Sequence, residues 1–116
     1  MSRGRGVTPA VVRRLALALP EVTEGSHFEQ ADFRVRQKIF ATLRKDGRTV
    51  GLKTSRADLD ALVSMDSQTF SDSWRGQWVS VRLDRVTKQV MRDLLADAWR
   101  LVAPKRLASG MRESGG

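Results

Sequence analysis

The stretch FRVRQKIFATLRKDGRTVGLK, residues 33–53, decides the fold class because apolar and polar side chains alternate along it. A period of two places successive side chains on opposite faces of a β-strand. Asp46 and Gly47, near the middle, form a dipeptide that is typical of hairpin turns. The stretch therefore predicts three consecutive antiparallel strands. The side chains predicted to face the core are Phe33, Val35, Ile39, Ala41, Leu43, Val50 and Leu52.

Helical patterns lie on both sides of this stretch. Thr8 is suited to cap a first helix, whose apolar residues follow at the spacing of one buried face. After the third strand, Ser55 is suited to cap a short second helix. Two further strands are predicted near residues 69–73 and 78–83. The last helix carries a wide apolar stripe and ends before Pro104.

The resulting order, α-β-β-β-α-β-β-α, predicts an α+β fold. We expect a single domain with an antiparallel sheet of about five strands and with the helices mainly on one face. The length of 116 residues suits one domain. We expect it to span residues 8–107. The basic arm before it, residues 1–7, and the tail after it, residues 108–116, are too rich in glycine, serine and charge to pack, and we expect both to be disordered.

The composition excludes several classes of function. The sequence has no cysteine and one histidine, which rules out disulfides, zinc ribbons, iron–sulfur clusters and thiol nucleophiles. It has neither a glycine-rich phosphate loop nor a G-x-S-x-G elbow, so we predict no cofactor and no enzymatic activity. It also lacks a signal-peptide pattern and an apolar run long enough to cross a membrane. We therefore expect a cytoplasmic protein without a membrane partner.

The charge is strongly basic but unevenly distributed. Lys and Arg number 21 against 13 Asp and Glu, which gives a net charge of +8. Half of this charge lies in the two terminal segments, residues 1–7 and 103–116. Residues 26–53 carry seven cations against three acids. The predicted strands are therefore the most basic part of the domain, a balance that favours a nucleic-acid partner.

Six short segments are distributed, in this order and spacing, across roughly residues 10–107, which is almost the entire domain. They are ALPEV at 18–22, HF at 27–28, KIFA at 38–41, GLK at 51–53, GQWVSV at 76–81 and AWRLVAPKR at 98–106. Through these segments the chain resembles the MmcQ/YjbR family. The resemblance implies a compact α+β domain with an antiparallel sheet, described as a double-wing or CyaY-like arrangement. It also implies a DNA-binding function, without a catalytic motif.

The outward side of the predicted sheet combines cations with aromatic rings. Cations displace condensed counterions from phosphates, and an exposed ring can stack on a base. We therefore predict a phosphate-directed, salt-sensitive nucleic-acid-binding face, with duplex DNA as the expected partner and a monomer or homodimer as the expected state. An outer face that is merely solvated remains the alternative. The candidate residues are Arg34, Arg36, Lys38, Phe40, Arg44, Lys53, Trp78 and Arg82.

The aromatic residues also allow a function of another class. Phe40, Trp74 and Trp78 could line a surface for a protein or a small ligand, in a module that performs no catalysis. Alternatively, Trp74 and Trp78 could pack in the core, as large aromatic side chains of small domains often do. Trp99 lies on the apolar stripe of the last helix, and we expect it in the core.

The single histidine has three possible roles. His27 lies close in sequence to three carboxylates, Glu24, Glu29 and Asp32. Such a group could perform acid–base chemistry or hold a metal weakly. It could equally make a structural hydrogen bond in the turn before the second strand, and this last role is our prediction.

Overall fold

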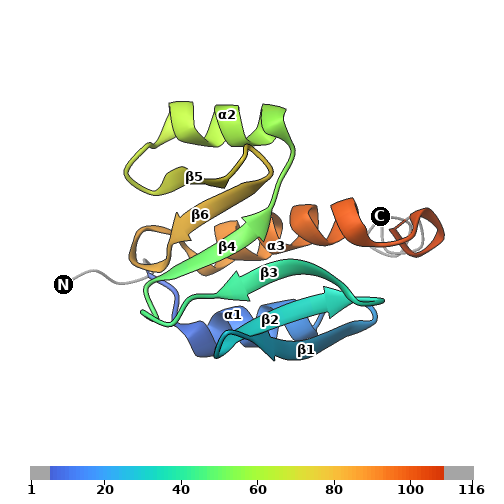
Figure 1. Cartoon of the computed structure of the whole chain (residues 1–116). Coiled ribbons are helices and arrows are strands. Elements are labelled where there is room, and N and C mark those ends of the chain that lie inside the picture. Colours follow the sequence, from blue (N-terminus) through green and yellow to red (C-terminus); the bar gives the residue numbers. More distant parts are fainter. Residues whose placement is uncertain (1–5, 109–116) are drawn as a thin grey trace.

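The computed structural model describes residues 6–108, and it confirms the α+β class (Figure 1). Within this range, six strands form one antiparallel sheet in the order β1-β2-β3-β4-β6-β5, one strand more than predicted. The elements are α1 (Pro9–Leu17), β1 (Val22–His27), β2 (Gln30–Val35), β3 (Lys38–Leu43), β4 (Thr49–Lys53), α2 (Arg56–Met65), β5 (Phe70–Trp74), β6 (Trp78–Arg82), the 3₁₀ turn η1 (Leu83–Arg85) and α3 (Lys88–Val102).

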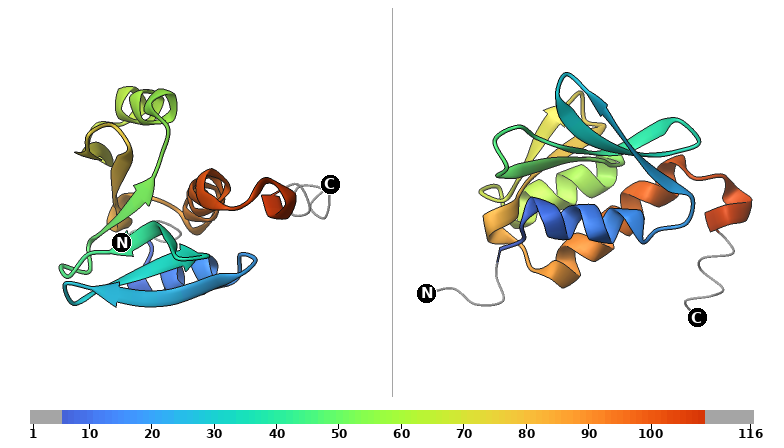
Figure 2. Two further views of the ribbon diagram at one scale, coloured as in Figure 1. Left: turned by 45° about the vertical axis from the view of Figure 1, so that its right-hand side comes forward. Right: turned by 90° about the horizontal axis from the view of Figure 1, so that it is seen from below.

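The helices cover one face of the sheet. Helix α3 packs against β3 and β4, and α1 packs against α3 and β1, whereas α2 lies beside β5. In the right-hand view of Figure 2, α1 and α3 lie together on one side of the strands. We call this side the core face. Figure 1 looks onto the opposite side, the outer face, and there the strands lie in front of α1 and α3.

Three hydroxyl side chains explain where the helices begin. Thr8, Ser55 and Thr87 precede α1, α2 and α3, and each side chain accepts a hydrogen bond from the backbone N–H three residues later. Such caps satisfy N–H groups that have no partner within the helix. The caps predicted at Thr8 and Ser55 are therefore confirmed.

The core lies between the sheet and the helices. Trp99 of α3 is fully buried, and its indole N–H donates to the carbonyl of Pro20 at 3.0 Å. The predicted place of Trp99 in the core is therefore confirmed. The other fully buried large side chains are Phe33, Phe40, Leu52, Leu83, Met91, Leu95, Val12, Val35, Val50, Val79 and Val81.

The domain begins earlier than predicted. Val7 is buried, and its backbone N–H donates to the carbonyl of Leu83 at 2.8 Å. The predicted arm, residues 1–7, therefore overlaps the folded domain at its last positions. Residues 1–5 of the arm and residues 109–116 of the predicted tail lie outside the described residues.

Strand β1 is the strand that the sequence pattern did not predict. It is the edge strand beside β2, and most of its side chains are polar, so no alternation marks it. The turn from β1 to β2 is formed by Phe28 and Glu29, whose φ angles are 49° and 64°. Residues other than glycine adopt this left-handed region infrequently, and turn signals such as Asn-Gly are absent here. The hairpin therefore carried no recognisable sequence signal.

A β-bulge in β3 overturns the predicted orientation of Phe40. Phe33 of β2 pairs with Ala41, whereas Arg34 pairs with Ile39, so Phe40 is an extra residue in β3. An extra residue shifts the alternation by one position. Phe40 is consequently fully buried in the core, and Ile39 faces outward instead.

The structure also bears on membrane insertion. Across the described residues, none of the helices combines the length and the apolar character that crossing a membrane would need.

Candidate functional site

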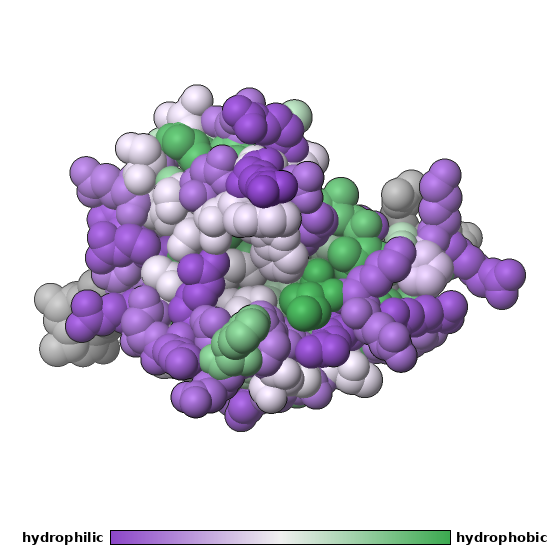
Figure 3. Space-filling model, in the orientation of Figure 1, coloured by the Kyte–Doolittle hydropathy of each residue, from purple (hydrophilic) through white to green (hydrophobic). Residues whose placement is uncertain are grey.

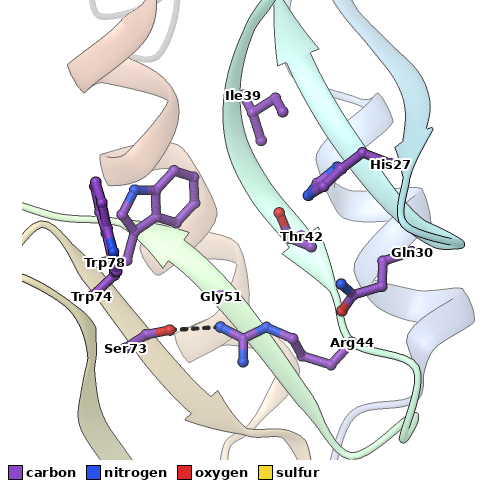
Figure 4. A pocket seen from close by; sticks show the side chains of 9 residues that line it. All are labelled: His27, Gln30, Ile39, Thr42, Arg44, Gly51, Ser73, Trp74 and Trp78. Atoms are coloured by element: carbon purple, nitrogen blue, oxygen red, sulfur yellow. Dashed lines mark hydrogen bonds between the residues drawn. The ribbon is translucent and has the colours of Figure 1, made fainter.

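The centre of the outer face is hollowed by a groove of about 260 Å³, which we call the outer groove (Figure 4). Side chains or backbone from all six strands contribute to it. Figure 3, which looks onto the outer face, shows a mainly hydrophilic surface around a paler centre that borders an apolar patch. The residues that line the outer groove are His27, Gln30, Ile39, Thr42, Arg44, Gly51, Ser73, Trp74 and Trp78.

Both register shifts of the sheet lie at the outer groove. The extra residue Phe40 turns its neighbour Ile39 toward the groove. In β5, a shift between Asp72 and Trp74 leaves Ser73 without a cross-strand partner, and Ser73 lines the groove as well. Bulges bend a strand and redirect its side chains. Regular strands would have given this face a simple alternation, so the bulges are what bring these side chains together.

Two tryptophans form one wall of the outer groove. Trp74 is 54% exposed, and Trp78 is half-buried, so neither belongs to the core. In Figure 4 the two indoles lie on the opposite side of the groove from Ile39. A cation lies over each ring: the Lys53 ammonium is 5.7 Å from the centre of Trp78, and the Arg75 guanidinium is 4.9 Å from that of Trp74. The wall therefore presents aromatic surface and positive charge together.

Arg44 forms the floor of the outer groove. Its side chain crosses β4, and Nη2 donates to the hydroxyl of Ser73 at 2.7 Å (Figure 4). A Cβ atom at Gly51 would lie 2.5 Å from Nη2, so glycine provides the space for this crossing. Among residues 6–108, neither Arg44 nor the two cations over the tryptophan rings forms an ion pair with a carboxylate.

His27 is held at the end of the groove by a buried carboxylate. Asp32 is fully buried and accepts two hydrogen bonds from Arg34, at 2.6 and 3.0 Å, and one from Nδ1 of His27, at 2.7 Å. The hydrogen bonds from Arg34 hold the pKa of the Asp32 carboxyl below its ordinary value; burial opposes this shift, and the bond from His27 reinforces it. Because a carboxylate only accepts, Nδ1 carries the proton and Nε2 is left for a ligand.

The sequence matches one known protein family, and the structure is similar to a solved one. The family model described as YjbR matches residues 17–101. The chain belongs to the YjbR family. Its structure is similar to the crystal structure of protein DR2400 from Deinococcus radiodurans, which carries a DUF419 domain, with a TM-score of 0.76 and 21% identity over 98% of this chain and 91% of that one. No curated protein matches the sequence significantly. The family predicted from the sequence is thus confirmed, and the likeness to DR2400 confirms the fold alone.

Three of the predicted site residues lie away from the outer face of this YjbR domain. Phe40 is in the core. Lys38 is exposed, but it pairs with the buried Val35 and therefore projects to the core-face side at the end of the sheet. Arg36 lies in the turn between β2 and β3 and forms an ion pair with Glu21 at 3.0 Å. The bulge at Phe40 accounts for the first two differences, and the tight turn accounts for the third.

The other five predicted residues do lie on the outer face. Two of them are paired with carboxylates, and three lie at the outer groove. Arg34 is paired with Asp32, and Arg82 at the end of β6 is paired with Asp84 at 3.0 Å. Arg44, Lys53 and Trp78 instead surround the outer groove or stack beside it. The positive charge of the outer face that carboxylates do not offset is therefore concentrated at the groove.

The carboxylates near His27 separate in the structure. Glu24 forms an ion pair with Arg13 at 2.9 Å, and Glu29 forms one with Lys45 at 3.5 Å. Asp32 is the carboxylate that contacts the imidazole. In the described part of the YjbR chain, no three histidine or acidic side chains gather closely enough to hold a metal ion. The predicted structural hydrogen bond of His27 is confirmed.

Five residues of the outer groove were not predicted as site residues, and one of them, Ile39, was expected in the core. Gln30, Thr42 and Ser73 are uncharged polar residues of the kind found on any solvated strand. Gly51 did carry a signal, because glycine inside a strand indicates close approach by another group. Here that group is the guanidinium of Arg44.

Proposed function

We propose that this protein binds nucleic acid through the outer face of its sheet, mainly by contacts to phosphates. One observation carries the proposal: among residues 6–108 no helix covers the outer face, and three cations that have no carboxylate partner in this range surround two accessible tryptophans. These cations are Arg44, Lys53 and Arg75. Phosphate contacts supply most of the affinity of such proteins, and exposed rings add stacking on bases.

The paired cations of the outer face contribute less to this function. Arg34 donates two hydrogen bonds to one carboxylate, so its charge is largely offset locally. Arg82 is likewise paired with Asp84. Three unpaired cations correspond to a salt dependence of about −2 to −3 in log affinity per log unit of salt. The expected binding is therefore moderate in strength and sensitive to salt.

Paired charge-neutralising variants test this function. The full-length chain is titrated with labelled duplex DNA, single-stranded DNA and RNA at several salt concentrations. Lys53→Gln combined with Arg75→Asn should lower the salt slope by roughly 2. Asn suits position 75 because the backbone there is left-handed, with a φ of 51°.

The matched control removes the same charge from the other side of the molecule. Lys88→Gln combined with Arg92→Gln neutralises two exposed cations of α3, away from the outer groove. This variant should bind as the wild type does. An equal loss of affinity in both double variants would mean that binding reflects net charge alone, and affinity without salt dependence would contradict the proposal.

A second function is favoured by the shape of the outer groove. A volume of about 260 Å³, with Ile39 and Trp78 as apolar walls and with polar groups converging on it, suits a small planar ligand. In this case the protein would be a ligand-binding or protein-binding module without catalysis. Its affinity would depend on Trp78 and respond little to salt, which separates it from phosphate-directed binding in the same titrations.

A further inference from the structure

We infer that the outer groove takes one unpaired base of a single-stranded nucleic acid, stacked against Trp78. This inference rests on the proposed nucleic-acid-binding function and specifies its ligand. It also changes the expected partner, because a groove that holds a base selects single strands over duplex DNA.

The walls of the groove have the chemistry of a site for a flat ring. The indole of Trp78 and the aliphatic side chain of Ile39 both line the groove, on opposite sides of it (Figure 4). The volume of about 260 Å³ lies just below the range of about 300 to 1,000 Å³ found for drug-sized ligands, so it suits one base-sized group. A base within a duplex is covered on both faces by its neighbours and must first be flipped out. An unpaired base can enter without that cost.

Polar groups are positioned to meet the edge of such a base. His27, Gln30 and Thr42 line the groove on the side of β1, β2 and β3. The hydrogen bond between His27 Nδ1 and the fully buried Asp32 fixes the ring and leaves Nε2 for a ligand. An amide and a hydroxyl can each donate or accept, so this edge of the groove can pair with the donors and acceptors of a base.

The cations around the groove would hold the flanking phosphates. Arg44 uses one guanidinium N–H for Ser73, and it retains others for an anion. The Lys53 ammonium lies over Trp78, at the rim of the same groove. A stacked base would therefore have positive charge on either side along the strand. Phosphate contacts alone would not require the aromatic wall, and this difference makes the inference testable.

The experiment compares three ligands that share a phosphate backbone. The full-length chain is titrated with a short labelled single strand of mixed sequence, with the same strand as a duplex, and with an abasic strand of equal length. The single strand should bind about 5- to 150-fold tighter than either of the other two, because one stacked base contributes roughly 1 to 3 kcal/mol. Trp78→Leu should abolish this preference and leave the affinity for the abasic strand unchanged.

Two further variants serve as controls for misfolding and for nonspecific effects. Trp78→Phe keeps an aromatic wall and should keep most of the preference. Phe28→Leu removes an aromatic side chain that is 84% exposed at the tip of the β1–β2 hairpin. The Phe28 ring contacts the His27 ring edge-on, at 5.8 Å between the ring centres, but does not line the groove, so the preference should fall much less than in Trp78→Leu. Equal losses in Phe28→Leu and Trp78→Leu would overturn the inference.

The outcomes distinguish this inference from the proposed function. If single strand, duplex and abasic strand bind equally and with a steep salt dependence, nucleic-acid binding stands and the base-binding groove is wrong. If none of the three binds in a salt-dependent way, both the proposed nucleic-acid binding and the base-binding groove are wrong. A preference for the single strand that depends on Trp78 supports both.

Discussion

Two arginines of the outer face are arranged alike but have different partners. Arg34 lies over Gly25 of β1, where a Cβ atom would be 2.9 Å from Nε, and Arg44 lies over Gly51 of β4, where it would be 2.5 Å from Nη2. Arg34 bonds the buried carboxylate of Asp32, whereas Arg44 bonds a neutral hydroxyl. The glycine beneath each arginine provides space, and the partner determines whether the positive charge is offset or remains available.

The difference between the partners has a simple electrostatic consequence. Two charge-assisted hydrogen bonds to one carboxylate fix a guanidinium and offset its charge. A hydroxyl fixes one N–H of a guanidinium and leaves the full charge. We therefore assign Arg34 to the stability of the β1–β2 half of the sheet. Arg44, in the half that carries both tryptophans, is the arginine that can attract a phosphate.

The largest expected effect is on stability, in Asp32→Asn. At neutral pH this change should lower the free energy of unfolding by about 1.5 to 3 kcal/mol, because it removes charge-assisted hydrogen bonds from a buried acceptor. The pKa of the Asp32 carboxyl is lowered in the fold, chiefly by the hydrogen bonds from Arg34. A lowered pKa stabilises the fold above the unfolded value of about 4, and this stabilisation is lost as the pH falls through the folded pKa.

Urea denaturation near pH 7 and near pH 3 checks this expectation. The difference between wild type and Asp32→Asn should be full at the higher pH and should shrink at the lower. Asp60→Asn is the control, because Asp60 is exposed and its ion pair with Arg56 lies at the surface. A difference that stayed constant with pH, or an equal loss in the control, would contradict a stabilising role for the Asp32 carboxylate.

The next effect is on binding, and it separates the two arginines directly. Arg44→Gln should reduce the salt slope of single-strand binding by about 0.7, the value for one phosphate contact, and leave the melting temperature nearly unchanged. Arg34→Gln should leave the salt slope nearly unchanged and lower the melting temperature, because the charge of Arg34 is offset by Asp32. Titrations and thermal melts of both variants provide the measurement. Equal salt slopes for the two variants would remove the distinction between the arginines.

Much of the fold could be predicted from local patterns. The alternation within residues 33–53, the helix caps at Thr8 and Ser55 and the apolar stripe around Trp99 all predicted the observed elements. Each of these signals depends on neighbours in the sequence. Strand β1 was missed because it is a polar edge strand, entered through a turn of left-handed Phe28 and Glu29 rather than glycine.

The site was only partly predictable, because its shape depends on contacts between distant segments. The alternation correctly placed Arg44, Lys53 and Trp78 on the outer face. It could not reveal the bulge that moves Phe40 into the core, since a bulge is set by packing between strands. Nor could it reveal that Arg44 would bond Ser73, which lies 29 residues away in the sequence.

Gly51→Ala should have the smallest effect on stability. Its effect on the site should be confined to the position of the Arg44 side chain. The added Cβ would meet only the end of the flexible Arg44 side chain, which can move aside. Alanine is also favoured over glycine within a strand by about 0.5 to 1 kcal/mol, so the melting temperature should hardly change. The hydrogen bond between Arg44 and Ser73 would break, and single-strand affinity should fall.

Gly25→Ala is the matched comparison. Its added Cβ would lie 3.0 Å from the buried Asp32 carboxylate as well as close to Arg34, so this variant should instead lower the melting temperature. Unchanged affinity in Gly51→Ala would mean that the position of the Arg44 guanidinium over β4 has no part in binding.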